Sequence, residues 1–195
     1  MEVNMREELD DMLCQKYPKM LVNRHAPMQQ TAMCWGFACG DGWFNLLDRL
    51  MNNIQHHIDW RNDTRSRNIA FNQAVIDARR HPADWTKFDA IYKNENSHTI
   101  QLRESIIDGS LQLLDVVPEV KQVVLDQVKE KFGTLRFYYS GGDEYISGLV
   151  AMAESMSGCI CETCGDAGKV RHGGWIRTLC DKHEQEHQSK NESEE

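Results

Sequence analysis

Four potential metal ligands form two pairs near the C-terminal end of the sequence. Cys161 and Cys164 are separated by two residues, as are Cys180 and His183, and fifteen residues lie between the pairs. A two-residue gap lets a tight turn direct two side chains at one ion, and Gly165 relieves backbone crowding after the second cysteine. Three thiolates and one imidazole complete a tetrahedral site that has no open position for water. We therefore expect these four residues to bind one structural zinc ion.

The segment between the two pairs predicts the elements that carry them. Residues 169–178 contain Gly173-Gly174, which is typical of the turn of a short hairpin, and Cys180 would then open a final helix that presents His183. A knuckle, a hairpin and a helix in this order resemble a treble-clef zinc finger. Some treble clefs are nucleases, so a nuclease or nucleic-acid binder is one alternative, with a candidate set of Arg171, His172, Arg177 and His187.

A second group combines basic and aromatic side chains. Lys129, Lys131 and Arg136 lie close together in an acidic chain and alternate with apolar residues, so a hairpin would place them on one face. Such a face could bind a phosphate and stack a base, or it could be an ordinary solvated sheet face. The candidate ligand-binding residues are Trp43, Lys129, Lys131, Arg136 and Tyr138.

The stretch from Cys34 to Trp43 contains two cysteines, glycines and aromatic residues before a helical pattern. Asp41 is placed to cap that helix. Cys34 and Cys39 could form a second metal site with His56 or His57, or the stretch could be a packing corner between helix and sheet. The sequence leaves both interpretations open.

The remaining patterns predict a mixed fold of helices and a small sheet. Residues 5–17, 41–58, 66–79 and 143–158 have helical spacing, a further helix after Pro82 would turn Trp85, Phe88 and Ile91 inward, and residues 99–117 are undecided. Residues 122–140 predict two strands joined near Gly133. The expected class is α+β, with helices packed on a β-hairpin or small antiparallel sheet and a C-terminal treble-clef-like module.

These elements suggest a domain division. Residues 1–158 would form the α+β core, with 61–98 as a possible insertion, residues 159–187 the zinc module, and residues 188–195 a disordered tail. Cys159, two residues before the first ligand, would be buried.

Composition excludes several classes of protein. The 195 residues include 22 Lys and Arg against 30 Asp and Glu, a net charge of −8 that disfavours nonspecific nucleic-acid binding. The chain is 41% hydrophobic without a long apolar run, so it is neither disordered nor membrane-spanning. The acidic first residues lack the basic and apolar regions of a secretory signal, and seven cysteines suggest thiols or metal ligands. We expect a cytoplasmic protein.

Several motifs together resemble an uncharacterised family of small phage, prophage and bacterial proteins. The motifs are Cys39-Gly-Asp-Gly-Trp43, Lys129-Glu-Lys-Phe-Gly-Thr-Leu-Arg-Phe-Tyr138, Ala153-Glu154-Ser155, Cys161-Glu-Thr-Cys-Gly165, Gly174-Trp175 and Thr178-Leu-Cys-Asp-Lys-His183. The resemblance covers residues 34–60 and 122–185 and implies a zinc module in a phage-linked setting, hence the host cytoplasm, without implying a reaction.

No nucleophile, base and orienting group occur at a recognisable spacing, so the sequence favours binding over catalysis. The first hypothesis is a zinc-containing accessory protein that engages or inhibits a host protein. The second is a nucleotide-binding protein that sequesters a host signalling nucleotide, and the third is the treble-clef nuclease.

Overall fold

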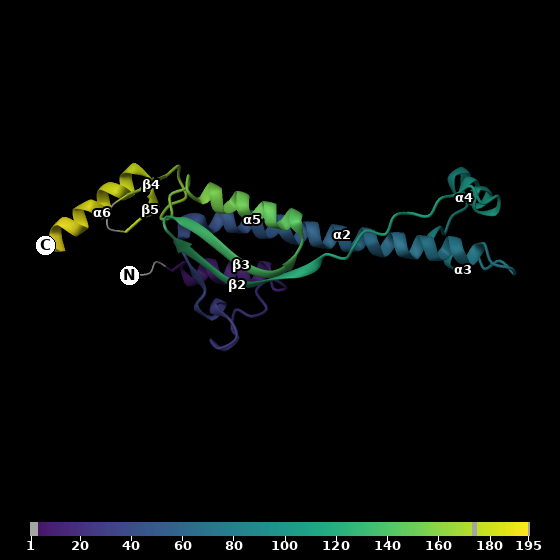
Figure 1. Ribbon diagram of the computed structural model, residues 1–195, viewed down its shortest axis with the longest axis horizontal. Coiled ribbons are helices and arrows are strands. Elements are labelled where there is room, and N and C mark those ends of the chain that lie inside the picture. The colour runs from purple at the N-terminus through teal and green to yellow at the C-terminus, as the bar shows by residue number, and fades with distance from the viewer. Residues whose placement is uncertain (1–3, 173–174, 195) are drawn as a thin grey trace. The chain divides into compact units, whose positions relative to one another are not determined.

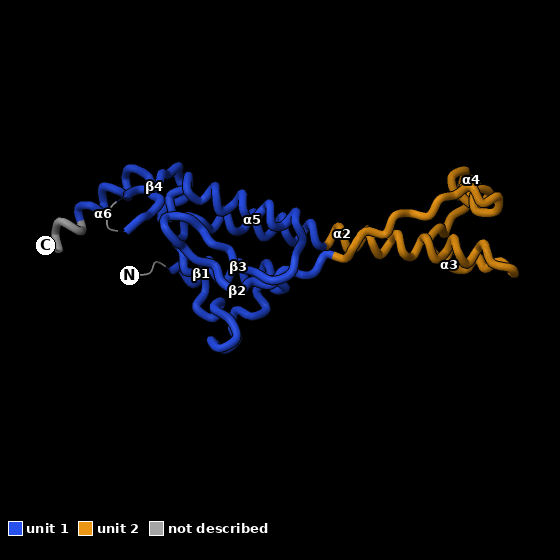
Figure 2. The backbone as a smooth tube through the Cα atoms, in the orientation of Figure 1, with its two compact units in different colours: residues 1–58, 120–195 blue, residues 59–119 orange. Residues whose placement is uncertain are grey.

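The chain folds into two compact units in the computed structural model, which describes residues 4–172 and 175–194. One unit comprises residues 1–58 and 120–195, and the other comprises residues 59–119 (Figure 2). Helix α2 (Phe44–Ala78) begins in the first unit and ends in the second. The structure therefore combines helices with small sheets, as the sequence predicts.

The first unit contains most of the elements (Figure 1). In chain order they are α1 (Glu7–Lys16), the 3-10 helix η1 (Ala32–Trp35), β1 (Phe37–Ala38), the 3-10 helix η2 (Asp41–Trp43), the first part of α2, β2 (Lys121–Lys131), β3 (Thr134–Gly142), α5 (Glu144–Ser157), β4 (Lys169–Arg171), β5 (Arg177–Leu179) and α6 (Asp181–Glu194).

The β2–β3 hairpin forms where the sequence predicts it. The turn residues Phe132 and Gly133 have φ angles of 55° and 78°, and two positive φ angles match the right-handed twist of the flanking strands. The sheet also has a third strand, β1, which pairs parallel to β2 with Phe37 opposite Val128. The three-stranded sheet is therefore mixed rather than purely antiparallel.

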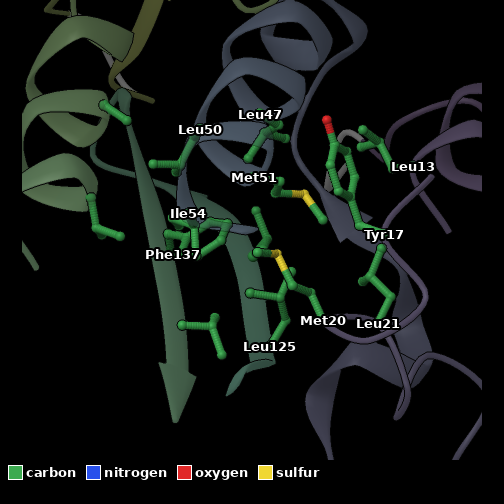
Figure 3. Packing of buried hydrophobic residues seen from close by; sticks show 14 of the residues in the cluster. Leu13, Tyr17, Met20, Leu21, Leu47, Leu50, Met51, Ile54, Leu125 and Phe137 are labelled. Carbon is green, nitrogen blue, oxygen red and sulfur yellow. The ribbon is translucent and has the colours of Figure 1, made fainter. Parts of the chain in front are cut away.

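One face of this sheet carries the core of the first unit. Val128, Leu135 and Phe137 are at most 3% exposed, because alternate residues of a strand point to the same face. They pack against apolar stripes of α1, α2 and α5 (Figure 3). The core includes Leu13, Tyr17, Leu47, Met51, Ile54, Leu125, Ile146 and Val150.

The start of α2 differs from the sequence-based expectation. Asp41 lies inside η2 rather than at the N-cap of a helix. Its Oδ1 accepts a hydrogen bond from the backbone N–H of Arg6 at 2.9 Å, and its carboxylate also pairs with the Arg6 side chain. Asp41 thus fixes the beginning of α1. Asp143, the first residue of the predicted helix 143–158, is the N-cap of α5, because its side chain accepts a hydrogen bond from the N–H of Ile146.

The second unit has its own small core. It contains the end of α2, α3 (Thr86–Ile91) and α4 (Ser97–Ile107), and Phe88 is fully buried among Val75, Ala78 and Ile106. Trp85 packs at the edge of this core, as predicted. Ile91, which is predicted to point inward, is 43% exposed. Ile91 is the last residue of a six-residue helix, too short to turn all three apolar residues inward.

Two boundaries differ from the sequence-based expectation. Residues 66–79 do not form a separate helix, since α2 runs without a break from Phe44 to Ala78. The second unit contains the predicted insertion 61–98 but continues to residue 119, because the chain returns along α2. Asn68 and Asn72 donate to the carbonyls of Asp115 and Leu114.

Helix α6 includes most of residues 188–195, the tail that is predicted from the sequence to be disordered. It continues to Glu194. Within it, the side-chain amide of Gln188 donates a hydrogen bond to the carboxylate of Glu184, and the hydroxyl of Ser189 donates one to the carbonyl of Gln185, each four residues earlier. None of the described helices has the length and apolarity needed to cross a membrane.

Side chains of α5 occupy the outer edge of β3. The N–H of Leu135 donates to Ser157 Oγ at 2.8 Å, and the N–H of Phe137 donates to Glu154 Oε1 at 2.9 Å. Ser157 is fully buried and donates its own proton to the carbonyl of Glu154. Two edge N–H groups are thereby satisfied without another strand.

We expect Ser157→Ala to lower the free energy of unfolding by about 1–3 kcal/mol, because it leaves the buried N–H of Leu135 without an acceptor. Chemical denaturation of the metal-loaded protein measures the change. Ser155→Ala, at an exposed position of the same helix, should change stability by less than about 0.5 kcal/mol. Equal effects of the two substitutions would contradict this role for Ser157.

Candidate metal centre

The four predicted ligands come together in the first unit. The ligand atoms of Cys161, Cys164, Cys180 and His183 all lie within 4.8 Å of one another. Among the residues whose side chains the structure describes, this is the only such group of three or more His, Cys, Asp or Glu side chains. The prediction that these two pairs come together is confirmed, and the four side chains lie close enough to bind one metal ion.

The distances within the cluster fit tetrahedral coordination. The sulfurs of Cys164 and Cys180 are 3.9 Å apart, and two sulfurs about 2.3 Å from one tetrahedral ion would be separated by about 3.8 Å. His183 Nδ1 lies 3.2 Å from the sulfur of Cys180 and 3.5 Å from that of Cys161. A thiolate and an imidazole on the same ion would be about 3.5 Å apart. The donor set therefore fits one ion with four protein ligands.

The first ligand pair lies on a tight turn. The N–H of Gly165 donates to the carbonyl of Cys161 at 2.8 Å, and the N–H of Cys161 donates to the carbonyl of Asp166. Gly165 has a φ of 83°, which a side chain would disfavour. This turn directs Cys161 and Cys164 to the same side of the chain.

The second ligand pair lies at the junction of β5 and α6. Cys180 directly follows β5, and its carbonyl accepts from the N–H of Glu184, so His183 lies on the first turn of α6. Lys169 and Arg171 of β4 both form ion pairs with Asp181, which lowers the pKa of that carboxyl and joins the hairpin to the helix. The predicted turn Gly173-Gly174 lies outside the described residues.

The thiols of the first pair differ in electrostatic environment. Burial favours the neutral thiol of Cys161, but backbone N–H groups, led by that of Cys180, outweigh this effect and lower its pKa. Desolvation, with the neighbouring carboxylate of Asp166 and the other cysteines, raises the pKa of Cys164 to about 12. A divalent cation would stabilise both thiolates, so metal binding releases protons.

The turn that carries Cys161 and Cys164, called the knuckle below, packs directly against the residues that precede α2. Glu162 is 4% exposed, and its Oε1 accepts from the N–H of Gly40 at 3.0 Å. Its carbonyl accepts from the N–H of Gly42 at 2.8 Å. Burial raises the pKa of the Glu162 carboxyl, and the Gly40 hydrogen bond opposes that shift. Residues that are far apart in the sequence thus share backbone hydrogen bonds beside the candidate metal site.

Two glycines permit this close approach. A Cβ added to Gly42 would lie 2.1 Å from the carbonyl oxygen of Cys161, and one added to Gly40 would lie 2.3 Å from that of Glu162. The Cys-Gly-Asp-Gly-Trp stretch is therefore a docking surface for the metal-binding knuckle. The glycines are evident in the sequence, but their contact with a distant segment of the chain is not.

Trp43 belongs to this docking contact rather than to a ligand-binding surface. It is fully buried, and its indole N–H donates to the carbonyl of Ile160 at 2.9 Å. A ligand could not stack on a ring that is covered by protein. The other candidate residues, Lys129, Lys131, Arg136 and Tyr138, do lie near one another on the outer side of the β2–β3 hairpin.

The suggested second metal site does not form. Cys39 is fully buried in the core, and among the side chains that the structure describes no metal-capable group contains it or Cys34. His57 instead contacts Asp143, with Nε2 and Oδ2 2.8 Å apart, and stacks on Tyr145. The interpretation as a packing corner accounts for Cys39.

The other residues near the module lie outside the metal cluster. Cys159 is exposed, contrary to the expectation that it is buried, because it lies in the turn after α5 rather than on the buried face of that helix. His172 is exposed and His187 is half-buried on α6, and neither belongs to the metal-capable group.

Comparisons with protein-family models, with curated proteins and with solved structures yield no match for this chain. Inferences about its function therefore depend on the geometry described above.

We expect Gly42→Ala to lower the free energy of unfolding by more than about 2 kcal/mol, because the new methyl group would overlap the carbonyl of Cys161. Thermal and chemical unfolding of the metal-loaded protein measure the change. Gly148→Ala is a matched control in α5, where nothing lies within 4 Å of the added Cβ. That substitution should stabilise the helix by up to about 1 kcal/mol. A parent-like stability of Gly42→Ala would contradict the docking contact.

Proposed function

We propose that this chain is a zinc-stabilised accessory protein that binds another protein through residues 59–119. The observation that supports this function is the apolar surface of that unit, all of which the structure describes. Nine of its large apolar side chains are exposed, each at 40% or more: Trp60, Ile69, Ile76, Ile91, Ile100, Ile107, Leu113, Leu114 and Val116. A concentration of exposed apolar side chains in one compact unit is typical of protein-binding sites, and two of the nine, Ile91 and Leu114, line the same pocket.

Zinc is the ion that suits the metal centre best. Three thiolates and one imidazole at tetrahedral spacing are typical zinc ligands, and with all four positions filled by protein the ion has no site for water. The proposed role of zinc is structural. It would hold the knuckle in the position that Gly40 and Gly42 contact.

The second unit also contains a pocket that could receive an anchoring side chain. Its volume is about 460 Å³, and its apolar walls include Phe71, Ile91, Tyr92, Leu102 and Leu114. Arg67, Asn68 and His98 also line it and supply polar groups. An apolar centre with polar groups around it is the usual arrangement of a protein interface.

The proposed occupant is a partner protein that presents one or two large apolar side chains to this pocket. Ile91 and Leu114 are both exposed and line the pocket, so the pocket opens within the apolar surface. Buried anchors of this type contribute most of the binding energy of many interfaces. The resemblance of the chain to phage and prophage proteins supports a partner from a bacterial host cytoplasm.

We expect Cys164→Ser to abolish zinc binding and to lower the free energy of unfolding by more than about 3 kcal/mol, because the ion loses one of its four ligands. Native mass spectrometry of the parent should find one zinc ion per chain. Cys159→Ser removes an exposed thiol outside the cluster, so it should retain the metal and the stability of the parent. A metal-free parent, or a Cys164→Ser variant with parent-like zinc content, would overturn the assignment.

We expect Ile91→Glu to weaken partner binding at least tenfold, since a carboxylate would enter an apolar pocket. The immobilised full chain is used to isolate partners from a bacterial lysate, and the affinity of each purified partner is then measured by calorimetry. Met152→Glu changes an exposed apolar residue of α5 in the first unit and should leave the affinity unchanged.

Two results would contradict this proposal. The first is a partner whose affinity depends on Met152 but not on Ile91. The second is self-association of the parent, seen by light scattering, that Ile91→Glu abolishes, because the occupant of the surface would then be a second copy of the chain.

A further inference from the structure

The outer face of the β2–β3 hairpin gathers positive charge in an acidic protein. The register pairs Gln127 with Tyr138, Lys129 with Arg136, and Lys131 with Thr134. Directly paired residues point to the same face, and so do residues two apart along a strand. All six side chains therefore share the face opposite the core, and three of them are cations while none is an acid.

The acidic residues Asp126 and Glu130 of β2 do not lie among these cations. Glu130 belongs to the opposite set of residues, and its Oε1 accepts from the N–H of Gly133 in the turn. Asp126 lies at the irregularity in β2, before Gln127, and marks the end of the cationic stretch. The chain as a whole has a net charge of −8, so the concentration of cations here is a local feature.

The cations are arranged beside exposed aromatic rings. Lys129 Nζ lies 5.5 Å from the ring centroid of Tyr138, and Lys131 Nζ lies 5.4 Å from that of Phe132. Tyr138 is 44% exposed and Phe132, in the turn, is 67% exposed. Each ring that could stack on a base thus has a cation within reach of the phosphate attached to that base.

The Arg136 side chain is held in place by the hairpin itself. Its Nη1 donates to Thr134 Oγ1 and to the carbonyl of Leu135, both at 2.6 Å. A guanidinium fixed in this way loses little further conformational entropy when it binds an anion through its other N–H groups. Lys129 and Lys131, two residues apart on one strand, add charges separated by about 7 Å along the face.

The β4–β5 hairpin contacts the turn between β2 and β3. Thr178 Oγ1 donates to the carbonyl of Gly133 at 2.5 Å, and the side chain of Ile176 would lie 3.1 Å from a Cβ at Gly133. Trp175, which precedes Ile176, is 64% exposed. The β4–β5 hairpin therefore supports the end of the β2–β3 hairpin where Phe132 lies.

We propose that this face, consisting of Lys129, Lys131, Phe132, Arg136 and Tyr138, is a binding site for single-stranded nucleic acid. Cations spread along two strands fit a chain of phosphates, and exposed rings between them fit unstacked bases. The site is separate from the protein-binding surface proposed for residues 59–119 and does not depend on it.

The first test measures binding of the full, metal-loaded chain to a fluorescent oligothymidylate by anisotropy at several salt concentrations. The affinity of the parent should fall as salt rises. Reversal of two charges in Lys129→Glu with Lys131→Glu should weaken binding at least tenfold and reduce the slope of log affinity against log salt by about 1.4, because two phosphate contacts are lost. Lys93→Glu, an exposed lysine of the second unit, should change affinity less than twofold.

The second test separates base stacking from charge. Phe132→Ala should weaken binding to the oligothymidylate at least fivefold but leave binding to an abasic strand of the same length unchanged. Circular dichroism and zinc content show that each variant retains its fold. Should charge reversal perturb the fold, Lys129→Gln with Lys131→Gln provides the same comparison.

Four outcomes would overturn the proposal. They are absence of salt-dependent binding by the parent, an equal loss in Lys93→Glu, equal competition by polyglutamate, and equal competition by a mononucleotide at the same phosphate concentration. The last two would identify an acidic peptide and a free nucleotide, respectively, as the ligand.

Discussion

The close contact between the Gly40–Gly42 backbone and the metal-binding knuckle is the constraint on which the first unit depends. The carboxylate of Glu162 accepts from the N–H of Gly40, 122 positions earlier in the chain, and its carbonyl accepts from the N–H of Gly42. The carbonyl of Ile160 accepts from the indole N–H of Trp43. Trp43 is the residue from which α2 continues. The position of the knuckle therefore determines where the longest helix of the core begins.

The same knuckle also connects to the sheet. The N–H of Glu162 donates to the carbonyl of Thr178, and the hydroxyl of Thr178 donates to the carbonyl of Gly133 in the β2–β3 turn. A bound ion would thus stabilise the start of α2 on one side and the end of the hairpin on the other. The four ligand side chains, the start of α2 and the end of the hairpin are therefore joined by one hydrogen-bonded network.

Local patterns allowed much of this structure to be predicted. Three features depend only on neighbouring residues, and the structure contains all of them. They are the ligand pairs at two-residue spacing, the alternation of Leu135 and Phe137, and Asp143 before a helix. Trp43 and Asp41 were misinterpreted because their roles depend on distant partners. In the sequence, Trp43 could bind a ligand and Asp41 could cap the helix that follows. In the structure, Trp43 instead donates to the carbonyl of Ile160, and Asp41 accepts from the N–H of Arg6. The unbroken length of α2 was missed because its polar middle lacks an apolar stripe.

The way in which α5 covers the edge of β3 limits how the sheet can interact with other molecules. Ser157 and Glu154 already accept the N–H groups of Leu135 and Phe137, which a foreign strand would need in order to extend the sheet. Addition of a peptide strand and edge-to-edge aggregation are both disfavoured at that position. Recognition at this part of the sheet must therefore use side chains on its face, where individual substitutions can alter specificity without changing the backbone.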